Sequence, residues 1–142
     1  MEKEEFEIRM SEYKFEEITE IKLHGDRFDY RPLNDSKGHG FVYLWIEELN
    51  DSYEVVYVGK AGKTMKSRLS QHKGGFHGRK GIGLKNAEKL KEGIGLGKRY
   101  FVYARESPTR KIHGIGVPFE SLEELAFMQI FKGKLWNIAN NA

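Results

Sequence analysis

Four side chains that could act on a phosphate lie between positions 43 and 72. Tyr43 and Tyr57 stand in two short apolar runs, and Arg68 and His72 follow in a basic stretch. Arginine offers a planar set of donors that matches phosphate oxygens. Histidine titrates near neutral pH and can relay a proton. If the four groups meet in the folded chain, they form a site suited to a phosphate.

The two tyrosines can meet if their runs form a β-hairpin. Residues 41–49 alternate imperfectly between apolar and polar, and residues 53–58 are rich in β-branched and aromatic types, so both are predicted to be strands. Residues 50–52 have the composition of a turn. A loop of three or five residues centred there places Tyr43 opposite Tyr57, whereas a four-residue loop breaks that register. The alternative interpretation is an aromatic pair that only stabilises the core.

A helix after the hairpin is predicted to position the arginine and the histidine. Thr64 fits an N-cap, and Met65 and Leu69, four residues apart, provide an apolar stripe. Arg68 and His72 are also four apart and share the margin of that stripe. They should therefore point along the sheet toward the tyrosines. The alternative interpretation for both is a solvated flank of the helix.

The order of these motifs resembles the GIY-YIG nuclease family, whose name spells two tyrosine motifs. Here the motifs read Phe-Val-Tyr after Gly40, and Tyr-Val-Gly at 57–59. The resemblance implies a metal-dependent DNA endonuclease with an α/β fold, a small three-stranded mixed or antiparallel sheet flanked by helices. Lys60 and the Arg-x-x-x-His pair resemble the restriction-enzyme branch. The alternatives are a homing or repair nuclease of this family and a catalytically inactive nucleic-acid-binding module on the same scaffold.

The resemblance also implies a metal ligand on a late helix. Residues 122–131 are apolar almost all round, which predicts a buried helix. The family carries a glutamate on such a helix and an asparagine after it, and these match Glu124 and Asn137, with Glu123 as the fallback ligand. The residues alone leave other readings open. Glu124 could complete a capping box with Ser121, and Asn137 could be structural.

Roles for the site residues follow from the resemblance. Glu124 would hold Mg²⁺ or Mn²⁺. Tyr43 would take a proton from the attacking water, helped by the ammonium group of Lys60 or by His72. Arg68 would clamp the scissile phosphate. The expected catalytic set is Tyr43, Tyr57, Lys60, Arg68, His72, Glu124 and Asn137.

Charge is unevenly distributed along the chain. Residues 60–99 carry 12 bases and 2 acids, a net +10, whereas residues 1–35 carry 11 acids and 6 bases, a net −5. Such a basic block is typical of proteins that bind a polyanion, although a solvated lysine-rich surface is the alternative. We expect double-stranded DNA as the partner, and a homodimer formed in solution or only on DNA. The expected DNA-binding residues are Lys63, Lys66, Lys73, Arg79, Lys80 and Lys85.

Composition limits the remaining possibilities. The 142 residues suit one domain, with residues 1–38 as an N-terminal extension packed on a nuclease domain at 39–142. The chain has no cysteine, which excludes disulfides and thiolate zinc sites. No apolar run approaches the roughly 20 residues of a membrane span. The first residues lack a secretory signal, so we expect a cytoplasmic protein.

Five further segments have predicted structures. Residues 6–10 alternate like an edge strand, and the glycine-rich residues 73–83 are predicted to be a mobile loop that contacts phosphates. Residues 86–92 are predicted to be a short helix. Residues 100–104 are predicted to be the third strand, and residues 106–116 a loop.

Overall fold

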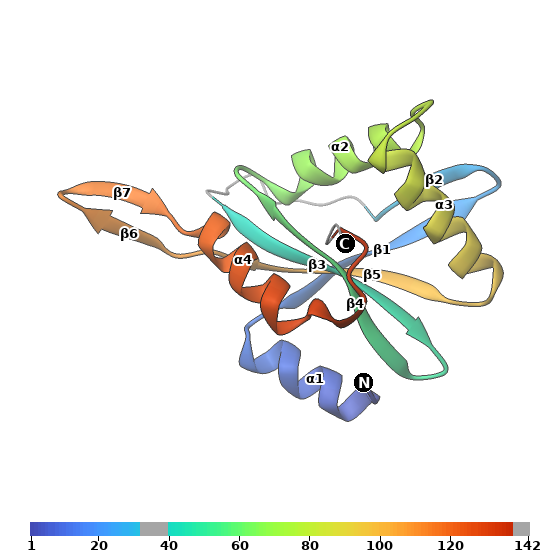
Figure 1. The fold of residues 1–142 in the computed structure, drawn as a ribbon, viewed down its shortest axis with the longest axis horizontal. Helices are drawn as coiled ribbons and strands as arrows, with labels where there is room; N and C mark the ends of the chain where they lie inside the picture. Colours follow the sequence, from blue (N-terminus) through green and yellow to red (C-terminus); the bar gives the residue numbers. More distant parts are fainter. Residues whose placement is uncertain (32–39, 138–142) are drawn as a thin grey trace.

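The computed structural model describes residues 1–31 and 40–137. Its centre is a five-stranded sheet in the order β2-β1-β5-β3-β4, in which every neighbouring pair is antiparallel (Figure 1). The antiparallel α/β fold is confirmed. The expected three-stranded sheet is wrong, because two further strands come from the N-terminal segment. The strands are β1 (Glu16–His24), β2 (Arg27–Asp29), β3 (Phe41–Leu49), β4 (Ser52–Ala61) and β5 (Arg99–Glu106).

The N-terminal segment is built into this sheet. It begins with α1 (Lys3–Glu12), so the edge strand predicted at 6–10 is wrong. A helix forms because Phe6 and Met10 are four residues apart and both point at the sheet, where they are 2% and 3% exposed. β1 then pairs with β5 in the middle of the sheet. The expected boundary between 38 and 39 lies outside the described residues.

Two helices cover each side of the sheet (Figure 1). The predicted helix at 86–92 is confirmed and is longer than expected. The glycine-rich loop predicted at 73–83 is wrong, since most of it is helical. A Cβ on Gly83 would lie 2.6 Å from the carbonyl oxygen of Gly75, so these glycines let two helices approach closely. The helices are α2 (Met65–Phe76), α3 (Ile82–Gly95), α4 (Glu120–Ile130) and the 3-10 turn η1 (Lys132–Lys134).

Alternate residues of β3 and β4 build a separate core on each side of the sheet. The side that packs on α2 and α3, here called the aromatic face, carries Tyr43, Trp45 and Tyr57. The opposite side, here called the aliphatic face, packs on Phe6 and Met10 of α1 and on phenylalanines at the α4 end of the chain. The aliphatic face carries Val42, Leu44, Ile46 and Val58.

A hairpin of β6 (Thr109–Ile112) and β7 (Ile115–Pro118) projects away from the body beside α4 (Figure 1). The loop predicted at 106–116 is therefore wrong. His113 and Gly114 have φ values of 50° and 79°, and two positive values are what a tight two-residue hairpin turn requires. The strand predicted at 100–104 is confirmed as the centre of β5.

The helix α4 is less buried than its apolar sequence predicts. Phe127 is its buried residue, whereas Leu122 and Leu125 are each 60% exposed. The predicted all-round burial is wrong because only one stripe of the helix meets the sheet. Within the described part of the chain, none of the helices has the length and apolar character needed to cross a membrane.

Candidate active site

The turn between β3 and β4 is shorter than predicted. Asn50 and Asp51 form a two-residue turn with φ values of 50° and 61°, and Leu49 pairs with Ser52. Side chains alternate strictly along a strand, so this turn alone would place the two tyrosines of the motifs on opposite faces.

A β-bulge restores the expected arrangement. The register shifts between Trp45 and Ile46, so Val56 is the extra residue on β4. Tyr57 therefore pairs with Trp45, and Gly59 pairs with Tyr43. The predicted direct pairing of the two tyrosines is wrong. Their rings nevertheless lie side by side on the aromatic face, with centroids 6.0 Å apart and planes 19° apart.

Gly59 makes room for the Tyr43 phenol. A Cβ at Gly59 would overlap Cζ and the hydroxyl oxygen of Tyr43. The phenol therefore lies directly over the backbone of the neighbouring strand, and the residue is fully buried. This contact explains why a glycine is needed at position 59, which the sequence motif alone does not reveal.

The Tyr43 hydroxyl is held between two groups from α2. The Nε of Arg68 donates a hydrogen bond to the phenol oxygen at 3.0 Å, and Nε2 of His72 lies 2.5 Å from the same oxygen. An arginine N–H can only donate, so the phenol proton is directed toward His72. Burial, with a smaller contribution from Arg68, lowers the pKa of His72 to about 3. The imidazole is therefore neutral and can accept that proton.

Burial raises the pKa of Tyr43 well above its ordinary value, and the neighbouring Tyr57 raises it further. The Arg68 guanidinium opposes this effect but does not cancel it. The phenol is therefore protonated at rest. The Tyr43 phenol can act as a base only if His72 takes the phenol proton while the phenol oxygen accepts a proton from another molecule.

The helix α2 begins as predicted. The Thr64 side chain accepts a hydrogen bond from the backbone N–H of Ser67 at 3.1 Å, which confirms the N-cap. Met65 and Leu69 are buried beneath the helix. The His72 ring packs edge-on against the Trp45 ring at 4.8 Å, which fixes its orientation.

Lys60 lies on a different side of β4 from the Tyr43 phenol. It pairs with Val42 of the aliphatic face, and its Nζ donates to Oγ of Ser121 on α4 at 2.8 Å. Arg68, rather than Lys60, is the cation that contacts the phenol. The sequence does not predict this hydrogen bond between Lys60 of β4 and Ser121 of α4.

The two candidate glutamates on α4 have different surroundings. Glu123 accepts hydrogen bonds from Arg105 at 2.9 Å and from Ser107 at 2.7 Å, so its carboxylate is committed to β5 and the following turn. Glu124 makes no hydrogen bond or ion pair to the described residues. Burial raises the pKa of Glu124, and the charges of Lys60 and Arg68 act in the opposite direction.

The capping-box alternative does not match the start of α4. The N-cap position is Phe119, without a side-chain cap, and Ser121 is already inside the helix. Glu124 therefore does not cap the helix. Its charge acts on the tyrosine site, since it raises the pKa of Tyr57, although burial, Arg68 and Tyr43 have larger effects.

Asn137 lies on the open edge of β4. Its Nδ2 donates to the carbonyl of Val58 at 2.6 Å, and its Oδ1 accepts from the Val58 N–H at 3.4 Å. The preceding Trp136 N–H donates to the carbonyl of Val56 at 2.7 Å. The chain after η1 thus protects an edge strand, and this arrangement matches the structural alternative for Asn137.

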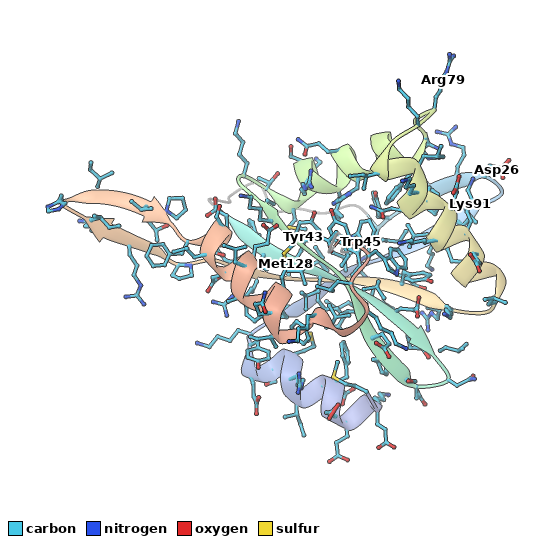
Figure 2. The ribbon with its side chains drawn as sticks, viewed as in Figure 1. Asp26, Tyr43, Trp45, Arg79, Lys91 and Met128 are labelled. Carbon is cyan, nitrogen blue, oxygen red and sulfur yellow. The ribbon has the colours of Figure 1, made fainter. Side chains whose placement is uncertain are left out.

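The expected DNA-binding residues surround α2 and α3. Lys63 and Lys66 are exposed near the start of α2, and Lys85 is exposed on α3. Figure 2 shows the Arg79 side chain reaching away from the body at the turn between the helices, next to Lys80. Lys73 is half-buried instead, with its Nζ 3.8 Å from the Asp29 carboxylate.

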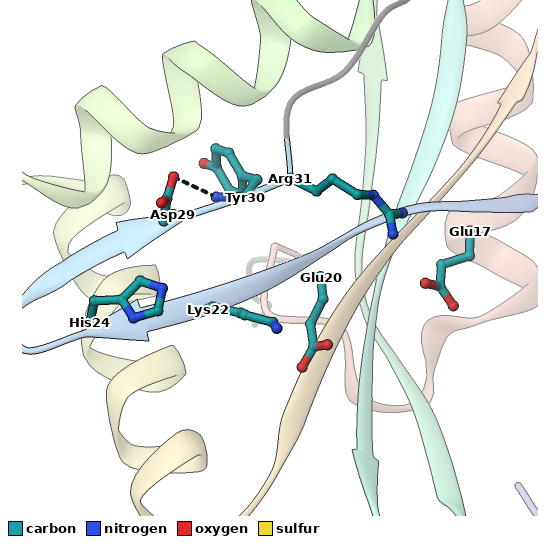
Figure 3. A pocket seen from close by; sticks show the side chains of 7 residues that line it. All are labelled: Glu17, Glu20, Lys22, His24, Asp29, Tyr30 and Arg31. Carbon is teal, nitrogen blue, oxygen red and sulfur yellow. Dashed lines mark hydrogen bonds between the residues drawn. The ribbon is translucent and has the colours of Figure 1, made fainter.

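A shallow pocket lies elsewhere, on β1 and β2 (Figure 3). Three of its six acidic and basic side chains, Glu20, Asp29 and Arg31, are bonded to other parts of the protein. Glu20 accepts two hydrogen bonds from Arg99, and Tyr30 donates to the carbonyl of Leu69. The pocket therefore braces the sheet against α2. It is lined by Glu17, Glu20, Lys22, His24, Asp29, Tyr30 and Arg31.

Comparison with known proteins identifies the fold. No family model matches the sequence, and no curated protein matches it. A mutant of EndoII from bacteriophage T4 superimposes with a TM-score of 0.69 at 21% identity, over 93% of this chain and 98% of that one. The restriction endonuclease HPY188I in complex with product DNA gives a TM-score of 0.47 at 18% identity, over 98% and 86% of the two chains. The chain therefore has the fold of the phage protein.

Proposed function

We propose that this protein is a metal-dependent DNA endonuclease of the GIY-YIG type. The observation that carries the proposal is the Tyr43 hydroxyl, held between Arg68 and His72. A buried phenol with a cation on one side and a neutral imidazole on the other is arranged for proton transfer beside an anion. The fold shared with EndoII of phage T4 supports a nuclease.

The residues at the site fit one hard divalent cation. The described residues contain no group of three or more His, Asp or Glu side chains that could hold a metal. Mg²⁺ commonly uses one or two carboxylates, with waters and substrate phosphate oxygens completing its shell. Glu124, half-buried and without a protein partner among the described residues, fits that role. A bound Mg²⁺ or Mn²⁺ would stabilise charge on the phosphate and on the leaving oxygen.

The protein groups would then share the remaining work. Arg68 donates from Nε to the Tyr43 hydroxyl and from Nη1 to Oε1 of Gln71 at 3.0 Å, so Nη2 is the group that would reach a phosphate oxygen at the mouth of the site. Tyr43 would take a proton from the attacking water while passing its own to His72. Tyr57, stacked beside Tyr43, would orient the water or the phosphate. Lys60 would act on the Glu124 side of the site.

Double-stranded DNA is the proposed substrate. Exposed Lys66 and Lys85 lie on the helices that cover the aromatic face, and exposed Lys63 lies just before α2, so the basic surface and the Tyr43 hydroxyl share one side of the sheet. Phosphate contacts of this kind position a duplex without reading its sequence. The lysine after the second motif and the spacing of Arg68 and His72 favour a restriction-type enzyme over a homing or repair nuclease.

The test compares two adjacent glutamates. Glu124→Gln should abolish plasmid cleavage in Mg²⁺, because the metal contributes several kcal/mol to transition-state stabilisation. Its thermal stability without metal should stay equal or rise, since a half-buried carboxylate without a partner is removed. Glu123→Gln is the matched control. It should keep cleavage but lose stability, since it weakens the hydrogen bonds to Arg105 and Ser107.

The result that would refute the mechanism is full cleavage by Glu124→Gln. Loss of cleavage in Glu123→Gln instead would move the metal ligand by one residue. Binding of a duplex without cleavage by the wild-type protein in Mg²⁺ or Mn²⁺ would favour the inactive binding module.

A further inference from the structure

Arg68 is held at two of its three guanidinium nitrogens. Its Nε donates to the Tyr43 hydroxyl, and its Nη1 donates to Oε1 of Gln71, which lies three residues later in α2, each at 3.0 Å. A guanidinium group is planar and rigid, so fixing two of its nitrogens also fixes the third. The direction of Nη2, the nitrogen that would reach a phosphate oxygen, therefore depends on Gln71 as well as on Tyr43.

Both of these hydrogen-bond partners of Arg68 are uncharged. Two other arginines are held by carboxylates instead: Arg99 donates two hydrogen bonds to Glu20, and Arg105 forms an ion pair with Glu123 at 2.9 Å. Those carboxylates compensate the charge of their arginines. A phenol and an amide orient Arg68 equally well but leave its positive charge for an anion.

The Gln71 amide can bind Arg68 in one orientation only. An arginine N–H donates and cannot accept, so the amide oxygen faces Nη1 and the NH2 group points elsewhere. Residues three apart are neighbours on the surface of a helix, and Gln71 is exposed, whereas Tyr43 is fully buried. The buried phenol thus holds the inner side of the guanidinium, and the exposed amide holds its outer side.

We propose that Gln71 is a positioning residue for phosphodiester cleavage, whose neutral amide oxygen orients the Arg68 guanidinium toward the scissile phosphate without neutralising its charge. This role rests on the proposed nuclease function. A free arginine side chain has many rotamers, so an Arg68 that is ordered before DNA binds loses less conformational entropy at the phosphate. Misplacing such a group by about 1 Å can slow a reaction by about 100-fold.

The first test removes the acceptor. Gln71→Met keeps an unbranched side chain of similar length but cannot accept the hydrogen bond from Arg68. Single-turnover cleavage of a duplex in Mg²⁺ at saturating protein should slow by about 10- to 100-fold. Affinity for the duplex should change by less than about twofold, because many phosphate contacts share it. The matched control is Gln129→Met at an exposed glutamine of α4, which should cleave like the wild type.

The second variant separates orientation from charge. Gln71→Glu keeps an acceptor for Arg68 and adds a negative charge beside it. The guanidinium should stay oriented, but its charge is now compensated. The duplex should therefore bind more weakly, and cleavage should fall for this electrostatic reason.

The orientation of Arg68 can be measured without cleavage. In NMR spectra of the arginine side chains, recorded without DNA or metal, restricted rotation of the guanidinium gives separate Nη1 and Nη2 signals. Arg68→Lys assigns the Arg68 signals by their loss. The wild type and Gln71→Glu should show separate signals, whereas those of Gln71→Met should merge.

Three results would overturn the proposal: wild-type cleavage by Gln71→Met, merged Arg68 signals in the wild-type protein, or full activity of Gln71→Glu. A Gln71→Met variant that binds the duplex less tightly but cleaves normally once saturated would also overturn it, by showing that Gln71 contacts DNA itself. A wild-type protein that holds Arg68 but cleaves no duplex in Mg²⁺ or Mn²⁺ would refute the proposed function and leave the orienting contact standing.

Discussion

The aromatic and aliphatic faces are built by alternate residues of the same two strands, yet they differ in chemistry. Tyr43 and Leu44 are neighbours in β3, and both are fully buried. Tyr43 ends in a hydroxyl that contacts Arg68 and His72, whereas Leu44 packs among apolar side chains. A tyrosine buries a large apolar ring and still presents a polar atom. The β3–β4 hairpin can therefore contribute to stability through one face and to catalysis through the other.

If the aromatic face carries the chemistry, the largest loss of cleavage should come from removing the Tyr43 hydroxyl. Tyr43→Phe should lower the rate of DNA cleavage by about 10²–10⁴-fold, because positioned proton transfer contributes that much. Stability should change by no more than about 1–3 kcal/mol, since the ring stays and only the partners of the hydroxyl are left unpaired. Single-turnover cleavage and urea unfolding measure the two effects.

Tyr103→Phe is the matched control for this change. Tyr103 lies on β5 opposite Leu44 and packs against the Phe6 ring of α1. Removing its hydroxyl should leave cleavage unchanged. Equal activity of Tyr43→Phe and wild type would remove the catalytic difference between the faces.

The second prediction concerns the aliphatic face. Leu44→Ala should lower the free energy of unfolding by about 2–5 kcal/mol, the usual cost of a cavity at a fully buried leucine. Cleavage per folded molecule should remain near the wild-type value, since Leu44 points away from the Tyr43 hydroxyl. Urea unfolding and cleavage below the melting transition provide the measurements. A loss of cleavage in fully folded Leu44→Ala would show that the two faces are coupled.

The features that lie within the single helix α2 could be predicted from the local sequence. The cap at Thr64 follows from its residue type, and the shared face of Arg68 and His72 follows from their spacing of four residues. Both side chains contact the Tyr43 hydroxyl, because the side of α2 that carries them packs on the sheet. These features depend on a few neighbours in the chain, so a sequence alone contains them.

Register and strand number could not be predicted in the same way. A two-residue turn and a bulge at Val56 each reverse the alternation, and together they bring Tyr57 back to the expected face. The prediction of adjacent rings was right for a wrong reason. Lys60 lies three residues after Tyr57, so its side chain points to the α4 side in the predicted and in the observed register alike. The strand β1 joins the sheet through long-range pairing with β5 that no local pattern reveals.

The third prediction concerns the close contact between Gly59 and the Tyr43 phenol on the aromatic face. Gly59→Ala should destabilise the protein by about 1–3 kcal/mol, as overpacking of a core does. It should also reduce cleavage, because the new methyl group displaces the Tyr43 phenol from Arg68 and His72. The control is Gly62→Ala, where a Cβ would meet no atom within 4 Å. Matching stability and activity in the two variants would contradict the close contact.

The last prediction concerns pH and follows from the neutral His72. The pKa of His72 is about 3 in the folded protein and about 6.5 in an unfolded chain. Between these values the unfolded chain binds more protons, so stability rises with pH, by up to roughly 1.4 kcal/mol per pH unit. This stabilisation is complete above pH 6.5 and is lost as the pH falls toward 3. The aliphatic residues Val42, Leu44, Ile46 and Val58 do not titrate.

His72→Gln isolates this contribution, because glutamine keeps an acceptor for the Tyr43 hydroxyl but does not titrate. Urea unfolding at several pH values between about 4 and 7 should show a shallower loss of stability in the variant than in the wild type. The opposite effect of the raised pKa of Glu124 is present in both proteins and cancels in the difference. Replacing the exposed His77 by glutamine should leave the wild-type slope unchanged. Parallel slopes for His72→Gln and wild type would mean that the imidazole is charged when folded, and His72 could then not accept the Tyr43 proton.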